Sequence, residues 1–228
     1  MFVNNYIVFI YYKNLIMDDS QDNIELKNEG NRLYLVDLSD NLTVEIDFIK
    51  QIESLRGKNI NSENLIKALG KLSDNSVIYD LTAGLGRDAL ILALKGYRVV
   101  MLEKQPMLQQ MLENALKQLK NSEYKDIASR LELVKGDSKF YLKELPKKEG
   151  QVFYFDPMFP KRSKSAKVKK DLQILQKICT IDDDIEELLN MAKQKGKTIL
   201  KRPKTAFVLD KIKPHHIIAG SKVNFLVF

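Results

Sequence analysis

The sequence predicts an α/β fold, a doubly wound and mostly parallel sheet covered by helices on both faces. Apolar runs that suit buried strands alternate with helix-forming patterns over 77–200, an order typical of parallel sheets. Four of these runs end at or next to acidic residues: Asp80, Glu103, Asp137 and Asp156. Because ligands of such folds bind where parallel strands gather their carboxyl ends, we expect these side chains to share one edge of the sheet. A small β-rich or α+β segment, 1–72, precedes this core, 73–228.

The N-terminal segment is expected to hold short strands followed by two short helices. Apolar and aromatic runs separated by turn-forming residues predict strands at 6–12, 32–38 and 43–46. Apolar residues at helical spacing over 47–72 predict the helices. The run at 6–12 is far shorter than the roughly 20 residues that cross a bilayer. It also lacks the basic start and cleavage site of a signal peptide, so we expect a cytoplasmic protein without membrane association.

The core segment is expected to alternate strands and helices and to close with a hairpin. A proline in the first turn, Pro106, and glycines after the last turn, Gly96 and Gly196, mark helix ends. The expected strands are 77–79, 98–102, 131–134, 151–155 and 197–200, and the expected helices are 88–95, 106–119 and 182–194. A final apolar run, 217–228, is interrupted at Gly220 and predicts a C-terminal antiparallel hairpin.

Composition limits the classes of partner and site. The 228 residues suffice for one α/β domain with a small addition. Lys and Arg number 37 against 30 Asp and Glu, which gives a formal charge of +7 and a pI near 9.2. This balance favours a polyanionic partner, although a lysine-rich surface also serves solubility. The single cysteine, Cys179, excludes an intramolecular disulfide and offers no metal-ligand cluster, so no metal is expected.

A glycine-containing turn follows the first core strand. Gly84 and Gly86 lie where the backbone must pass close to a ligand. The run 84–89 satisfies the G-x-G-x-x-G/A pattern of dinucleotide-binding folds, and Glu103 ends the next strand where it suits ribose hydroxyls. One interpretation is therefore a dinucleotide site. Another is a strand-to-helix turn that needs glycine only for its shape.

Charged residues around this turn favour a different ligand. A dinucleotide places its pyrophosphate at the helix N-terminus, but here Arg87 and Asp88 occupy the turn and Asp80 lies just before it. This polar arrangement suits a zwitterion. S-adenosylmethionine has a zwitterion at its methionine end and a ribose diol for Glu103, so we expect it as the cofactor.

The end of the third core strand allows two interpretations. Asp137, followed by Ser138, lies where the adenine amino group of the same cofactor can be bound. The same two residues also fit the start of a helix, with Asp137 as the N-cap. Their position in the sequence leaves both open.

The fourth core strand runs into the tetrapeptide Asp156-Pro157-Met158-Phe159. It is similar to the D/N-P-P-Y/F loop of amino-group methyltransferases, with Met158 in place of the second proline. A nucleobase amine is a poor nucleophile because its lone pair is delocalised into the ring. The carboxylate of Asp156 and a backbone carbonyl can accept both N–H hydrogens and turn the lone pair toward a sulfonium methyl group, while Pro157 stiffens the loop. Phe159 can stack on the base; the alternative is a proline-containing turn without chemistry.

Basic residues follow the fourth and fifth core strands. We expect them to hold phosphates of a nucleic acid, although a lysine-rich run is also typical of a solvated loop. The candidates are Lys161, Arg162, Lys164, Lys167, Lys169, Lys170, Lys201, Arg202 and Lys204.

Together these motifs resemble the RsmJ family, ribosomal RNA small subunit methyltransferase J. The likeness rests on the runs DLTAGLGRDA at 80–89, LEK at 102–104, DPMFP at 156–160, KSAKVKK at 164–170 and KRP at 201–203. Members of the family transfer a methyl group from S-adenosylmethionine to N2 of a guanosine in bacterial 16S rRNA. The resemblance implies a class I, Rossmann-like methyltransferase fold. It also implies cofactor contacts from Arg87, Asp88, Glu103, Lys104, Asp137, Ser138 and Asp156.

The function expected from these observations is 16S rRNA guanine-N2 methylation, without a metal or a covalent intermediate. Its partner would be 16S rRNA or the small ribosomal subunit, and the oligomeric state is left open. Two alternatives are an amino-group methyltransferase for another RNA, a protein amine or a small molecule, and a non-catalytic RNA-binding or NAD-binding domain.

Overall fold

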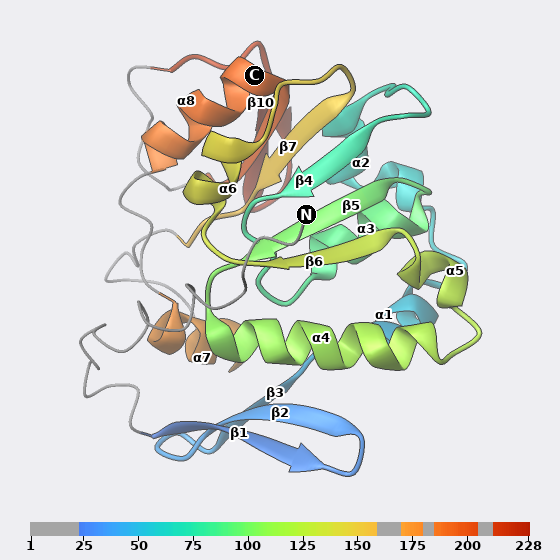
Figure 1. Cartoon of the computed structure of the whole chain (residues 1–228), viewed down its shortest axis with the longest axis vertical. Helices are drawn as coiled ribbons and strands as arrows, with labels where there is room; N and C mark the ends of the chain where they lie inside the picture. Colours follow the sequence, from blue (N-terminus) through green and yellow to red (C-terminus); the bar gives the residue numbers. More distant parts are fainter. Residues whose placement is uncertain (1–22, 159–169, 180–184, 205–211) are drawn as a thin grey trace, which may run out of the picture.

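A seven-stranded sheet forms the centre of the molecule (Figure 1). The computed structural model describes residues 23–158, 170–179, 185–204 and 212–228. The strands, in their order across the sheet, are β6 (Leu131–Lys135), β5 (Arg98–Glu103), β4 (Val77–Asp80), β7 (Gln151–Phe155), β8 (Lys197–Pro203), β10 (Val223–Val227) and β9 (His216–Ala219). Strands β6, β5, β4, β7 and β8 run parallel to one another. Strand β10 is antiparallel to β8, and β9 is antiparallel to β10. This confirms the doubly wound fold and its closing hairpin.

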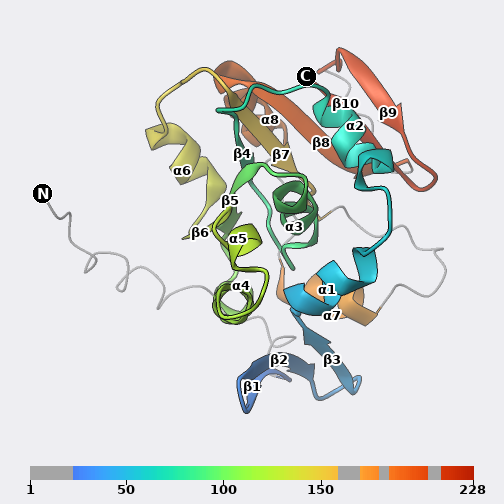
Figure 2. The same cartoon turned by 90° about the vertical axis from the view of Figure 1, so that its right-hand side faces the viewer.

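Helices cover both faces of this sheet. Helices α3 (Arg87–Leu94) and α6 (Ser138–Glu144) lie on opposite sides of it in Figure 2. Helix α4 (Pro106–Lys120) shares an apolar cluster with α3, and α8 (Ile185–Lys195) shares a second cluster with α6. Side chains of a strand alternate between these clusters because successive residues point to opposite faces. The shorter helices are α2 (Asn64–Leu69), the 3-10 helix η3 (Ile60–Ser62) and α5 (Lys125–Ala128).

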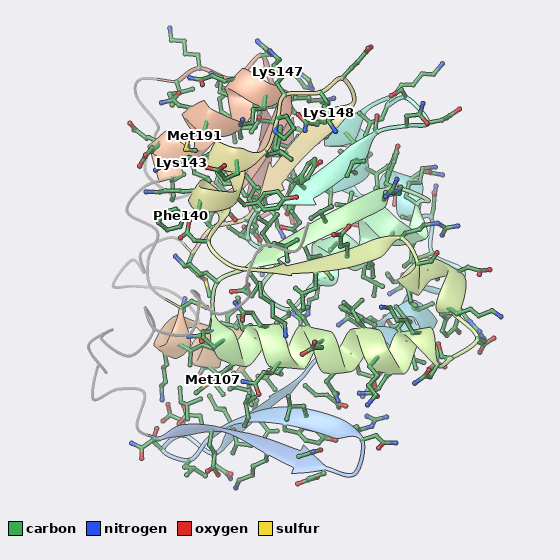
Figure 3. The ribbon with its side chains drawn as sticks, viewed as in Figure 1. Met107, Phe140, Lys143, Lys147, Lys148 and Met191 are labelled. Atoms are coloured by element: carbon green, nitrogen blue, oxygen red, sulfur yellow. The ribbon has the colours of Figure 1, made fainter. Side chains whose placement is uncertain are left out.

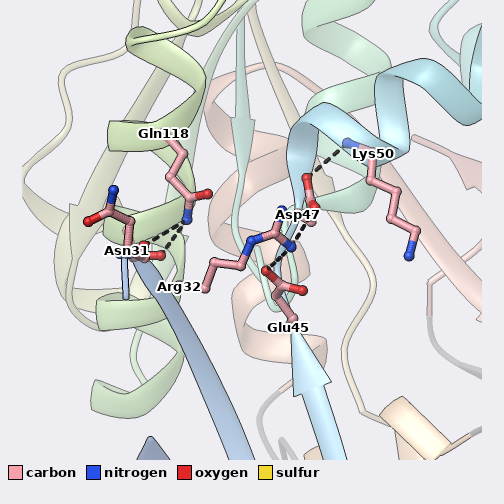
Figure 4. Close-up of polar contacts among 7 residues, drawn as sticks. Asn31, Arg32, Glu45, Asp47, Lys50 and Gln118 are labelled. Carbon is pink, nitrogen blue, oxygen red and sulfur yellow. Dashed lines mark hydrogen bonds and ion pairs between the residues drawn. The ribbon is translucent and has the colours of Figure 1, made fainter. Parts of the chain in front are cut away.

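A second, three-stranded antiparallel sheet precedes the core (blue in Figure 1). It consists of β1 (Ile24–Glu29), β2 (Arg32–Asp37) and β3 (Leu42–Glu45), and it packs on α4 and on α7 (Lys170–Ile178). Helix α1 (Phe48–Leu55) follows it. In Figure 4, Arg32 pairs with Glu45 and Asp47, and Gln118 of α4 donates to the backbone oxygen of Asn31. One apolar cluster includes both segments, and the division at 72/73 stays a prediction.

Several elements differ from those expected. Strand β1 and helix α7 were not expected, because β1 contains only two apolar residues, Ile24 and Leu26, and α7 follows a long basic stretch. Strand β8 continues to Pro203, three residues beyond the expected end, because β10 pairs with it along its whole second half. The strand expected at 6–12 lies outside the described residues.

A buried ion pair joins the small sheet to α7. Asp37 is fully buried, and Lys177 Nζ lies 2.5 Å from its Oδ2 and 2.6 Å from Oδ2 of Asp40. Burial alone would raise the pKa of Asp37, but hydrogen bonds from Lys177, from the Ser39 hydroxyl and from backbone N–H groups outweigh it and lower the pKa to about 2. The carboxylate is thus ionised in the folded protein, and its charge depends on Lys177.

Replacing Lys177 with Met should destabilise the protein by about 1–3 kcal/mol at neutral pH, since it leaves a buried carboxylate without its cation. The folded pKa of Asp37 is depressed, so the pair contributes stability above the ordinary carboxyl pKa and loses it as the pH falls toward about 2. Chemical denaturation of both proteins between about pH 7 and pH 2 measures this difference. Lys170→Met, at the exposed start of the same helix, is the control. A loss that is equal at every pH would contradict the role of charge.

Candidate active site

A cavity of about 910 Å³ lies at the edge of the sheet where the parallel strands end. It brings together most of the side chains that the sequence singled out. From the cofactor set it is lined by Asp80, Gly84, Arg87, Asp88, Glu103, Lys104, Asp137, Ser138 and Asp156, and from the substrate loop also by Pro157 and Met158. Phe159 lies outside the described residues. The acidic residues at successive strand ends thus share one edge of the sheet, as expected, and their contact with a cofactor stays a prediction.

Glu103 links two of the loops around this cavity. The side chain is buried at the end of β5, where Oε2 accepts from Gly84 N–H and Oε1 from Gln105 N–H, each at 2.8 Å. Burial raises the pKa of Glu103, and these backbone donors oppose the rise. Backbone N–H of Lys104 is a third donor, and since a carboxylate has about four acceptor positions, Glu103 retains acceptor capacity for a hydroxyl group of a ribose.

Asp80 ends β4 at the floor of the cavity. It is 2% exposed, and its Oδ1 accepts from Thr82 N–H at 3.2 Å. Burial raises the pKa of Asp80 well above its usual value, and the nearby carboxylate of Asp88 raises it further. A buried acid of this kind is stabilised in its ionised form by a cationic ligand, such as the ammonium group of a bound amino acid.

Asp156, Asp88 and Lys201 form a charged cluster beside Asp80. Lys201 Nζ lies 2.7 Å from Oδ2 of Asp88 and 2.9 Å from Oδ2 of Asp156, and the Tyr154 hydroxyl also donates to Oδ2 of Asp88. Burial raises the pKa of Asp156 to about 6, against the lowering effect of Lys201. Burial lowers the pKa of Lys201, but the two carboxylates outweigh it and raise that pKa above its usual value. The lysine is therefore a permanent cation at this site.

Hydrogen bonds fix the cavity loops to one another. Backbone N–H of Asp156 donates to the Thr82 hydroxyl at 2.7 Å, which joins the substrate loop to the turn after β4. Ser138 Oγ donates to the backbone oxygen of Leu81. Asp137 caps α6, since its Oδ1 accepts from Lys139 N–H at 2.7 Å. The N-cap interpretation of Asp137 is thus confirmed, and the same residue lines the cavity.

Gly86 packs against other helices, and the cofactor contact expected for it stays a prediction. It precedes α3 with a φ of 69° and does not line the cavity. A Cβ atom at this position would lie 2.7 Å from Cζ of Phe48 and 2.9 Å from Cδ2 of Leu112. Gly86 is required because helices α1 and α4 pack against it. Gly84, with a φ of 54°, lines the cavity, and the nearest atom to its added Cβ is the Thr82 oxygen at 3.9 Å.

The basic residues are placed less uniformly than expected. Lys161, Arg162, Lys164, Lys167 and Lys169 lie outside the described residues, whereas Lys170 begins α7 and Lys204 follows β8, both exposed. Lys201 and Arg202 were expected on a phosphate-binding surface. They lie within β8 instead, where Lys201 faces the carboxylates and Arg202 is only 8% exposed. The expected strand ended at Leu200, so the inward positions of both were missed.

Some residues that complete the cavity were not expected from the sequence. Tyr154 lies in a strand expected to be buried, and a hydroxyl inside an apolar run was a signal for a polar partner. One side of the cavity is formed by α7 and the residue that follows it, through Asp171, Leu172, Leu175, Gln176 and Cys179. Asp171 pairs with Arg87 at the start of α3. Apolar residues at helical spacing, Leu172, Leu175 and Ile178, were the signal for this helix.

Comparison with known proteins assigns the family. The family model described as "Putative SAM-dependent methyltransferase" matches residues 10–228. The chain belongs to this methyltransferase family. That description names S-adenosylmethionine as the cofactor and so confirms the cofactor expected from the sequence. The solved structure of a SAM-dependent methyltransferase from Neisseria gonorrhoeae is similar, with a TM-score of 0.68 and 25% identity over 89% of this chain and 81% of that one.

Two curated relatives in the methyltransferase family are named ribosomal RNA small subunit methyltransferase J. The protein from Alcanivorax borkumensis is 38% identical over 192 residues, which are 82% of this chain and 75% of the relative. The protein from Coxiella burnetii is 39% identical over 171 residues, which are 73% of this chain and 66% of the relative. The chain thus spans just under two thirds of the Coxiella protein. These matches confirm the resemblance to the RsmJ family.

The residues around the cavity fit the methyltransferase cofactor. Gly84 leaves open space at the turn, Asp80 offers a buried carboxylate for the amino acid end, and Glu103 retains acceptor positions for a ribose. Within the described ranges, no group of His, Cys, Asp and Glu side chains is arranged to hold a metal ion. No helix in those ranges is long and apolar enough to cross a bilayer.

The two glycines of the turn should respond differently to replacement by Ala. Gly86→Ala should destabilise the protein by about 2–4 kcal/mol, from backbone strain and from overlap with Phe48 and Leu112. Gly84→Ala should lower the free energy of unfolding by only about 1–2 kcal/mol, from backbone strain. It should nevertheless weaken S-adenosylmethionine binding at least about tenfold, because the methyl group of the new alanine enters the cavity. Chemical denaturation and calorimetry measure the two effects. Equal losses of stability in both variants would contradict the assignment of Gly86 to packing.

Proposed function

We propose that the protein transfers a methyl group from S-adenosylmethionine to N2 of a guanosine in 16S rRNA. The observation that supports this most directly is a shared cavity. Asp156 and Pro157, from the loop suited to an aromatic amine, line it together with Gly84 and Glu103 of the cofactor loops. The names of the curated relatives support small-subunit ribosomal RNA as the substrate class.

The proposed chemistry depends on positioning. The bound cofactor supplies an electrophilic methyl group on a positively charged sulfur. The carboxylate of Asp156 and a backbone carbonyl of its loop accept the two hydrogens of the guanine amino group, so that the nitrogen lone pair faces the methyl group. When bound, the cofactor would supply the methyl group and leave as a neutral thioether, and the carboxylate of Asp156 would accept the proton that the methylated nitrogen gives up. The target base must leave its stack, at a cost of a few kcal/mol that contacts in the cavity offset.

An exposed face of α6 supports an RNA partner. Phe140 is 70% exposed, and Lys143 Nζ lies 5.5 Å from the centre of its ring. Figure 3 shows both residues on the outside of the helix, with Lys147 and Lys148 in the chain that follows. An open aromatic ring among lysines suits single-stranded RNA, because bases stack on the ring and ammonium groups contact phosphates. Lys139, at the start of the same helix, lines the cavity.

Incubation with methyl-labelled S-adenosylmethionine and small ribosomal subunits from a strain that lacks the protein tests this function. We expect label in 16S rRNA, and nuclease digestion with mass spectrometry should identify N2-methylguanosine at one position. Subunits from a strain that contains the protein are the control, because their target should already be methylated. Label on a different atom, or on protein alone, would contradict the proposal.

Asp156→Ala should abolish transfer and leave the affinity for S-adenosylmethionine within about tenfold, or roughly 1.4 kcal/mol. The reason is that Asp156 is assigned to the substrate amine, whereas the cofactor retains Asp80, Gly84 and Glu103. Methyl transfer to small subunits and calorimetry with the cofactor measure the two quantities separately. Asp80→Asn is the matched comparison and should weaken cofactor binding. A large loss of cofactor affinity in Asp156→Ala would assign that residue to the cofactor instead.

A further inference from the structure

Lys201 lies where a surface phosphate contact was expected, but its surroundings are those of an internal cation. Its side chain is only 21% exposed and lines the cavity. Its ammonium group bridges Oδ2 of Asp88, at the start of α3, and Oδ2 of Asp156, at the end of β7. The lysine therefore connects the helix that follows the cofactor turn with the loop assigned to the substrate.

The ion pair between Lys201 and Asp156 also determines which carboxylate oxygen of Asp156 can bind a ligand. Both ion pairs of Lys201 use Oδ2 atoms, and Asp156 retains 36% exposure of its side chain within the cavity lining. Among the described residues, no ion pair of Asp156 involves Oδ1, and we assign this oxygen to the ligand. Four groups from four elements face this carboxylate: Asp80 of β4, Asp88 of α3, Tyr154 of β7 and Lys201 of β8. Two of these are acids that repel its charge, and Lys201 is the cation that offsets them.

We propose that Lys201 is a positioning residue for methyl transfer: its ammonium group keeps Asp156 ionised and occupies Oδ2, so that Oδ1 accepts a hydrogen of the substrate amino group. This inference rests on the proposed function, because it assigns Asp156 to the amine. Because Lys201 donates to Oδ2, a proton on Asp156 would sit on Oδ1, where its O–H would face the N–H of the amine and leave only a weaker acceptor. The lysine thus acts through Asp156 and makes no contact with the reacting atoms.

The pH dependence of transfer distinguishes this role from simple packing. In the native protein, kcat/KM should rise through the pKa of Asp156, which is about 6, as the carboxylate loses its proton. In Lys201→Met, removal of the cation should raise that apparent pKa by about 1–3 pH units. Activity near pH 7 should therefore fall by about twofold for a shift of one pH unit and about a hundredfold for three, and recover at higher pH. A structural role would lower activity equally at every pH.

Matched variants control for charge and for folding. Lys201→Arg retains the cation and should keep the native pH profile, whereas Lys201→Gln, which is neutral, should behave like Lys201→Met and replaces it if that variant does not fold. Lys197→Met removes a lysine from the same strand, where its ammonium donates to the Leu69 backbone, and should leave the pH profile unchanged. A native pH profile in both neutral variants overturns the proposal.

Titration of the Asp156 carboxyl carbon by NMR provides a readout that needs no RNA. The pKa of Asp156 should be higher in Lys201→Gln than in the native protein. If this increase is found while small subunits are not methylated, the proposed function fails and the effect of Lys201 on Asp156 stands. If subunits are methylated and the carboxyl carbon titrates identically in both proteins, the role of Lys201 is wrong.

Discussion

Repulsion between carboxylates at one edge of the sheet is the constraint on which this architecture depends. Asp80, Asp88 and Asp156 line one cavity, and burial disfavours the ionised forms of Asp80 and Asp156. The protein offsets that cost with one ammonium group, a tyrosine hydroxyl and backbone donors. Lys201 reaches the cluster because β8 runs parallel to β7 as far as Leu200 and continues past it. The site thus requires the outer strands as well as the cofactor turn.

The cavity is held together by contacts between loops that are distant in the sequence. Thr82 accepts from the backbone of Asp156, Ser138 donates to the backbone of Leu81, and Glu103 accepts from the backbone of Gly84. Each bond joins the turn after β4 to the end of another strand. Because β4 is the middle strand of the parallel part of the sheet, its turn can reach the ends of β5, β6 and β7. Rigid connections of this kind can hold two ligands of the cavity in a fixed relative geometry.

The sequence predicted the strand ends and the acidic residues at them, because hydrophobic runs and turns are local patterns. It did not predict the position of Lys201, since the apolar run ends at Leu200 and the strand continues only through its pairing with β10. The packing that requires a glycine at position 86 was also not predictable from the sequence. Its neighbours, Phe48 and Leu112, are far away in the chain, and the fingerprint pattern suggested a ligand instead. Local patterns located the site, whereas tertiary packing decided which residues enter it.

The contact between Phe48 and Gly86 couples the N-terminal segment to the turn after β4. Phe48 does not line the cavity, but its ring packs directly against this turn. A change in side-chain size at position 48 would therefore disturb the turn from outside the cavity. Removal of the N-terminal segment would leave Gly86 without one of the side chains that pack on it.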